Sequence, residues 1–303
     1  MREGHGVHAQ RVTFDSSGEP LVGDMYLPGP LGGARRPAVV VAGAWATVKE
    51  QMAAGYAREL AGRGYLALAF DFRSWGESGG RPRSMEDPHA KSADIVAAAE
   101  FLAGHPAVDR EAIAGLGICA GSSYMVAAAT QAPLIKSLAL VAPALPTHAD
   151  VMENLGGEQS EATLIDVANK ARAEYEATGR QALVSAVPPG KSDSVAGGDY
   201  YTNPDRGLIP EWENTFNMAS WSSWIPFDVH ALADQLTQPL LVVHSDAAVN
   251  PDSVREFVTK VSGPAEQLWL DAVTQFDFYD QTGPMTAASD AAAAHFEHSL
   301  SLR

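Results

Sequence analysis

Short, uninterrupted apolar runs alternate along most of the chain with longer segments in which apolar and polar residues are mixed. Runs of this kind are typical of strands buried on both faces of a parallel sheet, and the mixed segments are typical of helices that cover those faces. The alternation therefore predicts an α/β fold. The predicted strands span residues 37–41, 65–70, 112–118, 137–141, 240–243 and 267–270, and the predicted helices span about 48–64, 91–104, 125–130 and 285–300.

The beginning of the chain has a different pattern. Residues 7–14 and 21–27 are two strand-like segments, separated by the polar, turn-forming run 15–20. Two such segments joined by a short turn predict an antiparallel hairpin. Together with the six apolar runs, this hairpin predicts a mostly parallel sheet of eight strands flanked by helices.

The alternation stops after residue 143 and resumes at about residue 228. The segment between them is more polar, contains a helical stretch at 162–179 and then becomes rich in aromatic residues. A long insertion at one point of a parallel sheet commonly covers the functional site. We therefore expect a core formed by residues 1–143 and 228–303, and a mainly helical lid formed by residues 144–227.

Aromatic residues of this insertion, with one from the last part of the chain, are candidates to line a substrate pocket. Any single ring more often packs a lid onto its core than contacts a ligand. The group as a whole predicts an apolar pocket with a few polar groups. The candidates are Tyr201, Trp221, Trp224 and Phe276.

Composition excludes several classes of function. Asp and Glu number 37 against 21 Lys and Arg, and the net charge of −16 argues against nucleic-acid and anionic-membrane partners. A single cysteine excludes an internal disulfide framework and is compatible with the cytoplasm. The chain has neither an apolar N-terminal segment nor a motif typical of a metal or nucleotide site, so we expect a cytoplasmic enzyme without cofactor or metal. The expected partner is a small-molecule substrate, and a homo-oligomer is possible.

The most informative motif is Gly117-Ile118-Cys119-Ala120-Gly121, which lies between a predicted strand and a predicted helix. A strand, a tight turn and a helix form the context of the G-x-nucleophile-x-G elbow, in which larger residues at the two glycine positions would meet the neighbouring backbone. The start of the helix would favour a Cys119 thiolate and lower its pKa. The alternative is that Cys119 is a small buried apolar residue.

Four stretches of the chain resemble the α/β-hydrolase superfamily and, within it, the dienelactone-hydrolase-like branch with cysteine at the elbow. They are residues 41–51, 70–80, 117–121 and 276–280, and they span nearly the whole core in the expected order. The resemblance implies an α/β-hydrolase fold with a nucleophile–acid–histidine triad. It also implies an oxyanion hole made of two backbone N–H groups.

Carried onto this chain, the resemblance places Cys119 at the nucleophile position and the N–H group of Ala120 in the oxyanion hole. The second donor belongs to the loop after the strand at 37–41, where we assign Ala44, with Trp45 as the alternative. The acid position follows the strand at 240–243 and is assigned to Asp246, which could instead be a turn or cap residue.

The chain departs from the family pattern at the histidine position, which holds Gln275. A glutamine side chain cannot take a proton from the nucleophile near neutral pH, although it can orient a substrate or a water molecule. Three explanations are open: His148 or His244, and more weakly His89, serves as the base; the thiol reacts without a base; or the fold performs non-hydrolytic chemistry such as elimination, cyclisation or acyl transfer.

The leading hypothesis is an enzyme that acts on a small hydrophobic ester, thioester or lactone through Cys119 and the backbone oxyanion hole. One alternative is a non-hydrolytic enzyme of secondary metabolism on the same scaffold. The other is a catalytically silent protein that binds a small hydrophobic ligand.

Overall fold

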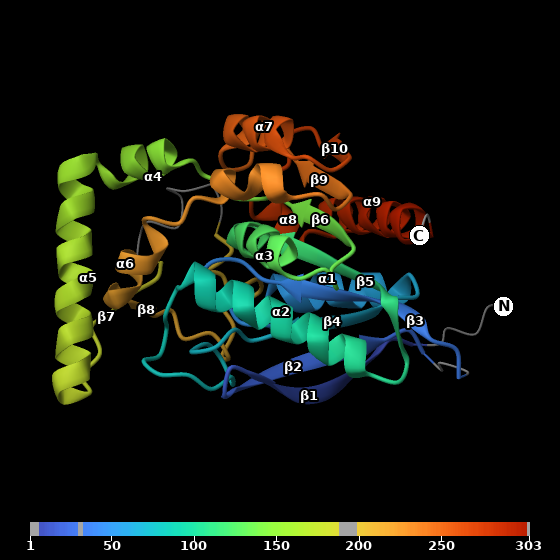
Figure 1. Ribbon diagram of the computed structural model, residues 1–303, viewed down its shortest axis with the longest axis horizontal. Coiled ribbons are helices and arrows are strands. Elements are labelled where there is room, and N and C mark those ends of the chain that lie inside the picture. Colours follow the sequence, from blue (N-terminus) through green and yellow to red (C-terminus); the bar gives the residue numbers. More distant parts are fainter. Residues whose placement is uncertain (1–5, 30–32, 188–198, 302–303) are drawn as a thin grey trace.

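The computed structural model describes residues 6–29, 33–187 and 199–301. At its centre lies an eight-stranded sheet with the order β1-β2-β4-β3-β5-β6-β9-β10 (Figure 1). β2 runs antiparallel to β1 and β4, and the other neighbouring strands are parallel, so the predicted mostly parallel sheet is confirmed. The strands are β1 (His8–Ser16), β2 (Glu19–Leu27), β3 (Arg36–Ala42), β4 (Leu66–Phe70), β5 (Val108–Ile118), β6 (Ser137–Val141), β9 (Leu240–His244) and β10 (Ala265–Trp269).

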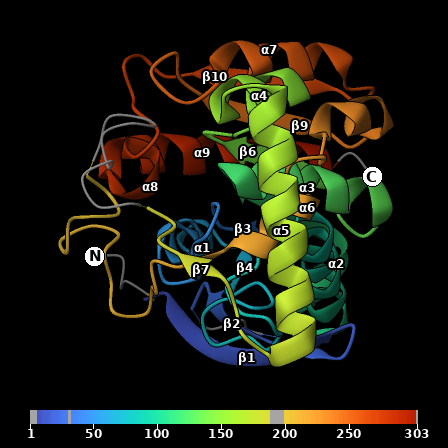
Figure 2. The same cartoon turned by 90° about the vertical axis from the view of Figure 1, so that its left-hand side faces the viewer.

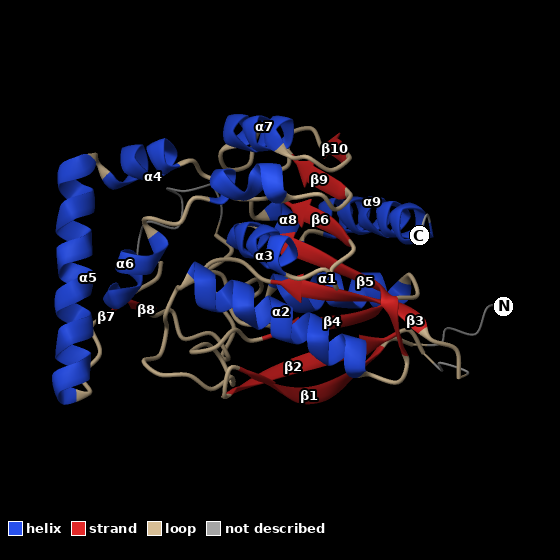
Figure 3. Cartoon of the chain, in the orientation of Figure 1, coloured by secondary structure: helices blue, strands red, loops and turns tan. Residues whose placement is uncertain are grey.

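Helices cover both faces of the sheet, as Figure 3 shows. One apolar cluster joins one face to α2, α3, α7 and the 3-10 helix η2, and a second joins the other face to α1, α8 and α9. Every residue of the central strands β4, β6 and β9 is buried, which explains why their sequences are uninterrupted apolar runs. The helices are α1 (Met52–Gly62), α2 (Pro88–Gly104), α3 (Ala120–Gln131), η2 (Val229–Gln235), α7 (Pro251–Lys260), α8 (Asp277–Asp280) and α9 (Thr282–Ser301).

The first helix is shorter than the sequence predicts, because residues 48–51 form a turn before it. The Val48 N–H group donates to Oε1 of Gln51 at 3.1 Å, and the Lys49 N–H group donates to Oδ1 of Asp71 at 2.8 Å. α2 begins three residues before its predicted start, because the Asp87 side chain caps it and Pro88 occupies its first turn.

Residues 144–227 contain most of the structure outside the core. The helix predicted at 162–179 corresponds to α5, which ends at a left-handed Gly179 and stands beside the core in Figures 1 and 2. Residues 188–198 of the predicted lid lie outside the described residues, and its role as a lid stays a prediction. The elements are α4 (His148–Leu155), α5 (Glu158–Thr178), β7 (Leu183–Val184), β8 (Phe216–Asn217), the 3-10 helix η1 (Met218–Ser220) and α6 (Trp221–Trp224).

Among the described residues, none of the helices is both long enough and apolar enough to cross a membrane.

Candidate active site

Cys119 occupies a one-residue turn between β5 and α3, with φ 53° and ψ −123°. Few non-glycine residues adopt a positive φ, so the surrounding structure must hold this one in place. A Cβ atom on Gly117 would lie 2.6 Å from Cα of Ser122, and one on Gly121 would lie 2.2 Å from the carbonyl oxygen of Gly43. Both glycines are therefore required by close backbone contacts, as the sequence predicts.

Four hydrogen-bonding groups surround the sulfur of Cys119: the hydroxyl of Tyr279, the side chain of Gln275 and the backbone N–H groups of Ala120 and Trp45. Burial raises the pKa of the thiol, and the hydrogen bonds of these four groups oppose that rise. The expectation that the helix start would lower the pKa of the thiol is therefore wrong, because loss of hydration outweighs the donors.

The two backbone donors at the sulfur come from the predicted oxyanion elements. Ala120 is the residue after Cys119, as expected, and the second donor is Trp45, which the sequence offered as the alternative to Ala44. Ala44 is buried one residue earlier, and its carbonyl oxygen accepts a hydrogen bond from the Thr47 hydroxyl at 2.8 Å. The loop after β3 thus aims the N–H group of Trp45 at the sulfur.

Gln275 is buried beside Cys119, and its amide also forms hydrogen bonds with other neighbours. Its Nε2 donates to the carbonyl oxygen of Ala142 at 2.9 Å and to the Tyr279 hydroxyl at 3.2 Å. Its Oε1 accepts from the Val249 N–H group at 3.2 Å. These bonds hold the amide beside the sulfur, and an amide has no acid–base role near neutral pH.

Tyr279 is a site residue that the sequence reasoning missed, although it lies in the quoted stretch 276–280. Its hydroxyl hydrogen-bonds both the Cys119 sulfur and the side chain of Tyr201. Burial and the neighbouring Cys119 raise the pKa of Tyr279 well above its usual value. The phenol therefore stays protonated near neutral pH and can donate to a negatively charged sulfur.

The predicted acid, Asp246, lies on the surface. Its side chain is 75% exposed and pairs with Arg255. Within the described residues, Asp246 forms no hydrogen bond with Cys119 or Gln275, so its carboxylate is not connected to the sulfur.

The histidines considered as alternative bases lie elsewhere. His148 is exposed at the start of α4, where its Nε2 is 3.9 Å from a carboxylate oxygen of Glu161. His244 is buried: its Nε2 donates to the carbonyl oxygen of Val249 at 3.0 Å, and burial lowers its pKa to about 4. His89 is exposed and packs edge-on against Phe227. None of the three is among the groups that contact the sulfur in the described part of the chain.

A buried ion pair stands next to this site and was not anticipated from the sequence. Nζ of Lys91 lies 2.8 and 2.7 Å from the two carboxylate oxygens of Glu86, and neither side chain is exposed by more than 1%. The same carboxylate accepts from the Tyr124 hydroxyl at 2.6 Å and from the Ala46 N–H group at 3.0 Å. Glu86 therefore ties α2 and α3 to the loop that carries Trp45.

The predicted pocket residues belong to two aromatic groups. Tyr201 and Phe276 contact each other edge-on at 5.6 Å, and both contact Tyr279. Trp221 and Trp224 contact each other at 5.7 Å, and the Trp224 side chain hydrogen-bonds the Tyr124 hydroxyl. Tyr201 and Phe276 thus adjoin Tyr279, which hydrogen-bonds the sulfur, whereas Trp221 and Trp224 connect to Tyr124.

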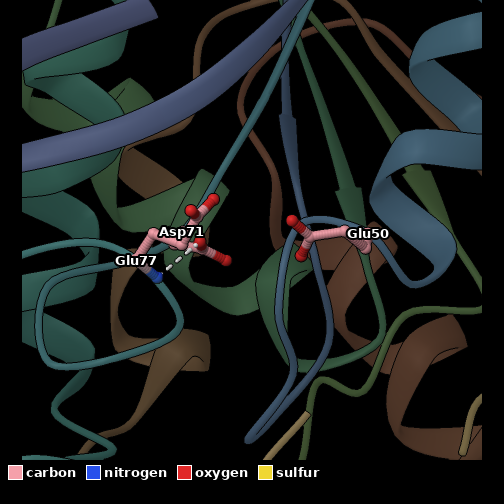
Figure 4. Close-up of side chains that lie close together, drawn as sticks. All are labelled: Glu50, Asp71 and Glu77. Carbon is pink, nitrogen blue, oxygen red and sulfur yellow. Dashed lines mark hydrogen bonds between the residues drawn. The ribbon is translucent and has the colours of Figure 1, made fainter. Parts of the chain in front are cut away.

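Three carboxylates, those of Glu50, Asp71 and Glu77, lie close to one another (Figure 4). Oxygen atoms at this spacing can hold a cation. Here Nζ of the buried Lys49 lies among them, 3.2 Å from Asp71 and 2.7 Å from Glu77, and it also pairs with Glu50. The lysine ammonium already supplies the positive charge, so this cluster is explained as an ion-pair network.

Comparison with known protein families identifies a family for this chain. Residues 17–274 match the X-Pro dipeptidyl-peptidase (S15) family. The chain belongs to this family. Its relative YcjY, an uncharacterized protein of Escherichia coli K12, is 27% identical over 306 residues that cover 96% of this chain and 99% of YcjY.

Solved structures confirm the α/β-hydrolase fold. PA2218 from Pseudomonas aeruginosa has a TM-score of 0.83 at 24% identity, over 99% of this chain and 98% of that one. The α/β hydrolase GrgF from Penicillium sp. sh18 has a TM-score of 0.80 at 18% identity, over 97% and 99%. The expected dienelactone-hydrolase-like branch is matched in fold alone: the enzyme from Anabaena variabilis has a TM-score of 0.59 at 11% identity, over 97% and 99%.

Shorter matches link the chain to two fungal proteins. The thiohydrolase aneE of Aspergillus aculeatus is 33% identical over 132 residues, 44% of this chain and 40% of aneE. The polyketide transferase claH of Penicillium crustosum is 34% identical over 122 residues, 39% of this chain and 40% of claH. The family match supports a hydrolase, and the relatives by sequence include a transferase.

Proposed function

We propose that this protein is an acyl-transfer enzyme that takes its acyl group from a thioester onto Cys119. The observation that carries the proposal is the sulfur of Cys119 in its tight turn, with the N–H groups of Ala120 and Trp45 directed at it. Two backbone donors at a nucleophile position can stabilise the oxyanion that forms when the nucleophile adds to a carbonyl carbon. The thiohydrolase and transferase among the relatives support the same class of reaction.

The groups around the sulfur favour a thioester over an ester or an amide. Gln275 and Tyr279 offer hydrogen bonds but no base near neutral pH. An alkoxide or an amine leaving group needs a proton from a strong general acid, usually an imidazolium. A thiolate leaving group has a pKa close to that of the attacking cysteine, so exchange between the two sulfurs is nearly balanced in free energy.

The proposed step keeps its atoms and protons in balance. The Cys119 sulfur bonds to the acyl carbon, the bond from that carbon to the substrate sulfur breaks, and the thiol proton ends on the departing sulfur. Tyr279 lies between the thiol and the pocket aromatics and can pass this proton through its hydroxyl. Hydrolysis of the resulting acyl-enzyme needs a base to activate water, so transfer to an incoming thiol or amine is favoured over hydrolysis.

Intact-mass spectrometry tests the proposal. We expect an octanoyl thioester of N-acetylcysteamine to add one acyl group to the wild-type chain and none to Cys119→Ala, which has no thiol. Octanoyl ethyl ester should add none. An added small thiol should clear the adduct faster than water does.

Two results would overturn the proposal. The first is a folded wild-type protein that gains no mass from any acyl thioester, which would favour the silent-binding alternative. The second is rapid cleavage of the ethyl ester that depends on Cys119, which would require a base that the contacts of the sulfur do not include.

A further inference from the structure

Two indole N–H groups are buried without a hydrogen-bond partner among the described residues: Nε1 of Trp45 and Nε1 of Trp221. The other four of the six tryptophans are partnered. An indole N–H group can only donate, and a buried donor without an acceptor is unfavourable. Two such donors in one region are available to an acceptor that the described residues do not supply.

Both indoles pack on one ring. Trp45 stacks on Phe216 at 4.9 Å between ring centroids, and Trp221 contacts the same ring at 4.8 Å. Trp221 also contacts Trp224, which hydrogen-bonds Tyr124. The unpartnered donors therefore belong to a continuous aromatic group, which we call the tryptophan group: Trp45, Phe216, Trp221 and Trp224.

The tryptophan group approaches Cys119 at both of its ends. The backbone N–H group of Trp45 is directed at the sulfur. Tyr124, which is hydrogen-bonded to Trp224, lies near enough to Cys119 for a charge on the sulfur to raise the pKa of Tyr124. An acyl group on the sulfur would therefore have the tryptophan group beside it. The rings can pack against the hydrocarbon part of an acyl chain, and the two N–H groups can donate to an oxygen in that chain.

We propose that the indole N–H groups of Trp45 and Trp221 bind an oxygen atom carried by the acyl chain, so that the preferred substrates are hydroxyacyl or ketoacyl thioesters rather than plain alkanoyl thioesters. That the substrate is a thioester rests on the proposed function, whereas the preference for an oxygenated chain rests on the two unpartnered donors. A site built to hydrogen-bond a substrate oxygen discriminates strongly against the analogue that lacks it.

The test compares octanoyl thioesters that carry a hydroxyl or keto oxygen at carbon 3, 5 or 7 with octanoyl thioester itself. Each rate of Cys119 acylation is divided by the rate of the same thioester with a free thiol, which removes differences in intrinsic reactivity. We expect at least one oxygenated thioester to react about tenfold faster than the plain one, which corresponds to about 1.4 kcal/mol. The ratio should fall toward one in Trp221→Phe, which retains an aromatic ring and removes the N–H donor.

Trp269→Phe is the matched control, because Nε1 of Trp269 donates to Gln267 at 3.0 Å on the surface. This control should keep the wild-type ratio. Should Trp221→Phe fail to fold, Trp45→Phe removes the other donor and retains the backbone N–H group. A ratio near one for all oxygenated thioesters in the wild-type protein would overturn the inference while leaving the proposed function in place.

Binding measurements separate the two proposals. Calorimetry on Cys119→Ala with stable amide analogues of the same acyl chains should show about tenfold tighter binding of an oxygenated analogue, and Trp221→Phe should abolish the difference. If the wild-type thiol is never acylated but this difference is found, the proposed function fails and the oxygen preference stands. If binding shows no difference, the oxygen preference fails whatever the chemistry.

Discussion

Replacing Lys91 by methionine would leave the Glu86 carboxylate buried without its counter-charge. In the wild-type protein, both carboxylate oxygens lie within 2.8 Å of Nζ of Lys91, and neither side chain reaches solvent. Removing one partner of a buried ion pair costs about 3–5 kcal/mol, because the remaining charge has lost its hydration and gained nothing. The hydrogen bonds from Tyr124 and Ala46 remain and hold the cost near the lower value.

The expected loss can be expressed as a change in melting temperature. Unfolding entropy near the midpoint is about 2.1 cal/mol/K per residue, or about 0.6 kcal/mol/K for a chain of 303 residues. A loss of about 3–5 kcal/mol therefore lowers Tm by about 5–8 °C. Differential scanning calorimetry at pH 8 measures this shift directly.

The loss should depend on pH. A carboxyl group that is buried without a counter-charge has a folded-state pKa above its unfolded-state value, so the folded protein binds the proton more strongly. Stability of Lys91→Met relative to the wild type should therefore recover as the pH falls from 8 toward 5.

Two further variants complete the experiment. The double variant Glu86→Gln/Lys91→Met should regain most of the stability, since no charge is left buried. Lys170→Met, which removes an exposed ion pair with Asp166, should change stability by less than about 0.5 kcal/mol. If Lys91→Met melts within 1 °C of the wild type at pH 8, the assigned role of this ion pair is wrong.

Three other predictions concern the turn and its surroundings. Gly121→Ala should destabilise the protein by about 1–3 kcal/mol or more, since its Cβ would lie 2.2 Å from the carbonyl oxygen of Gly43. The control Gly62→Ala, which has open space at its Cβ, should not destabilise it, and thermal melting compares the two variants. Gln275→His should speed hydrolysis of the acyl-enzyme by about 100-fold, because a histidine beside Cys119 would supply a base. The rate is measured as loss of the acyl mass, and an unchanged rate in a folded variant would contradict a role for position 275 in activating water. Alkylation of Cys119 by iodoacetamide should reach half its maximal rate at a higher pH than alkylation of free cysteine, because burial raises the pKa of the thiol. In Tyr279→Phe this midpoint should rise further, because a hydrogen bond that stabilises the thiolate is lost, and a fall would contradict the contact.

The fold and the turn at Cys119 could be predicted because they depend on local pattern. Residues 66–70, 137–141 and 240–244 are buried along their whole length, so their apolar runs identify them as central strands. The glycines at 117 and 121 are required by contacts within a few residues or with the adjacent loop, so a short sequence motif is enough to predict them.

The surroundings of the sulfur could be predicted less well, because they depend on how distant side chains meet. Asp246 follows the expected strand, yet its carboxylate turns outward to Arg255. The choice of Trp45 over Ala44 as donor depends on the direction of one peptide group, which no side chain reveals. The pairing of Glu86 with Lys91 and Tyr124 joins three separate elements, and a polar residue in a mixed segment normally indicates an exposed face.

The few buried residues of α5 determine how easily this helix separates from the rest of the molecule. Over its 21 residues, Ala168 and Ala171 are its only fully buried side chains, so little apolar surface attaches this helix to the rest. The ion pairs Lys170–Asp166 and Arg180–Glu174 are exposed and add little to this attachment. Segments with few buried contacts separate at a small fraction of the global unfolding free energy. α5 can therefore detach and return many times while the eight-stranded sheet stays folded, so its amide protons exchange with water long before those of β5 or β6.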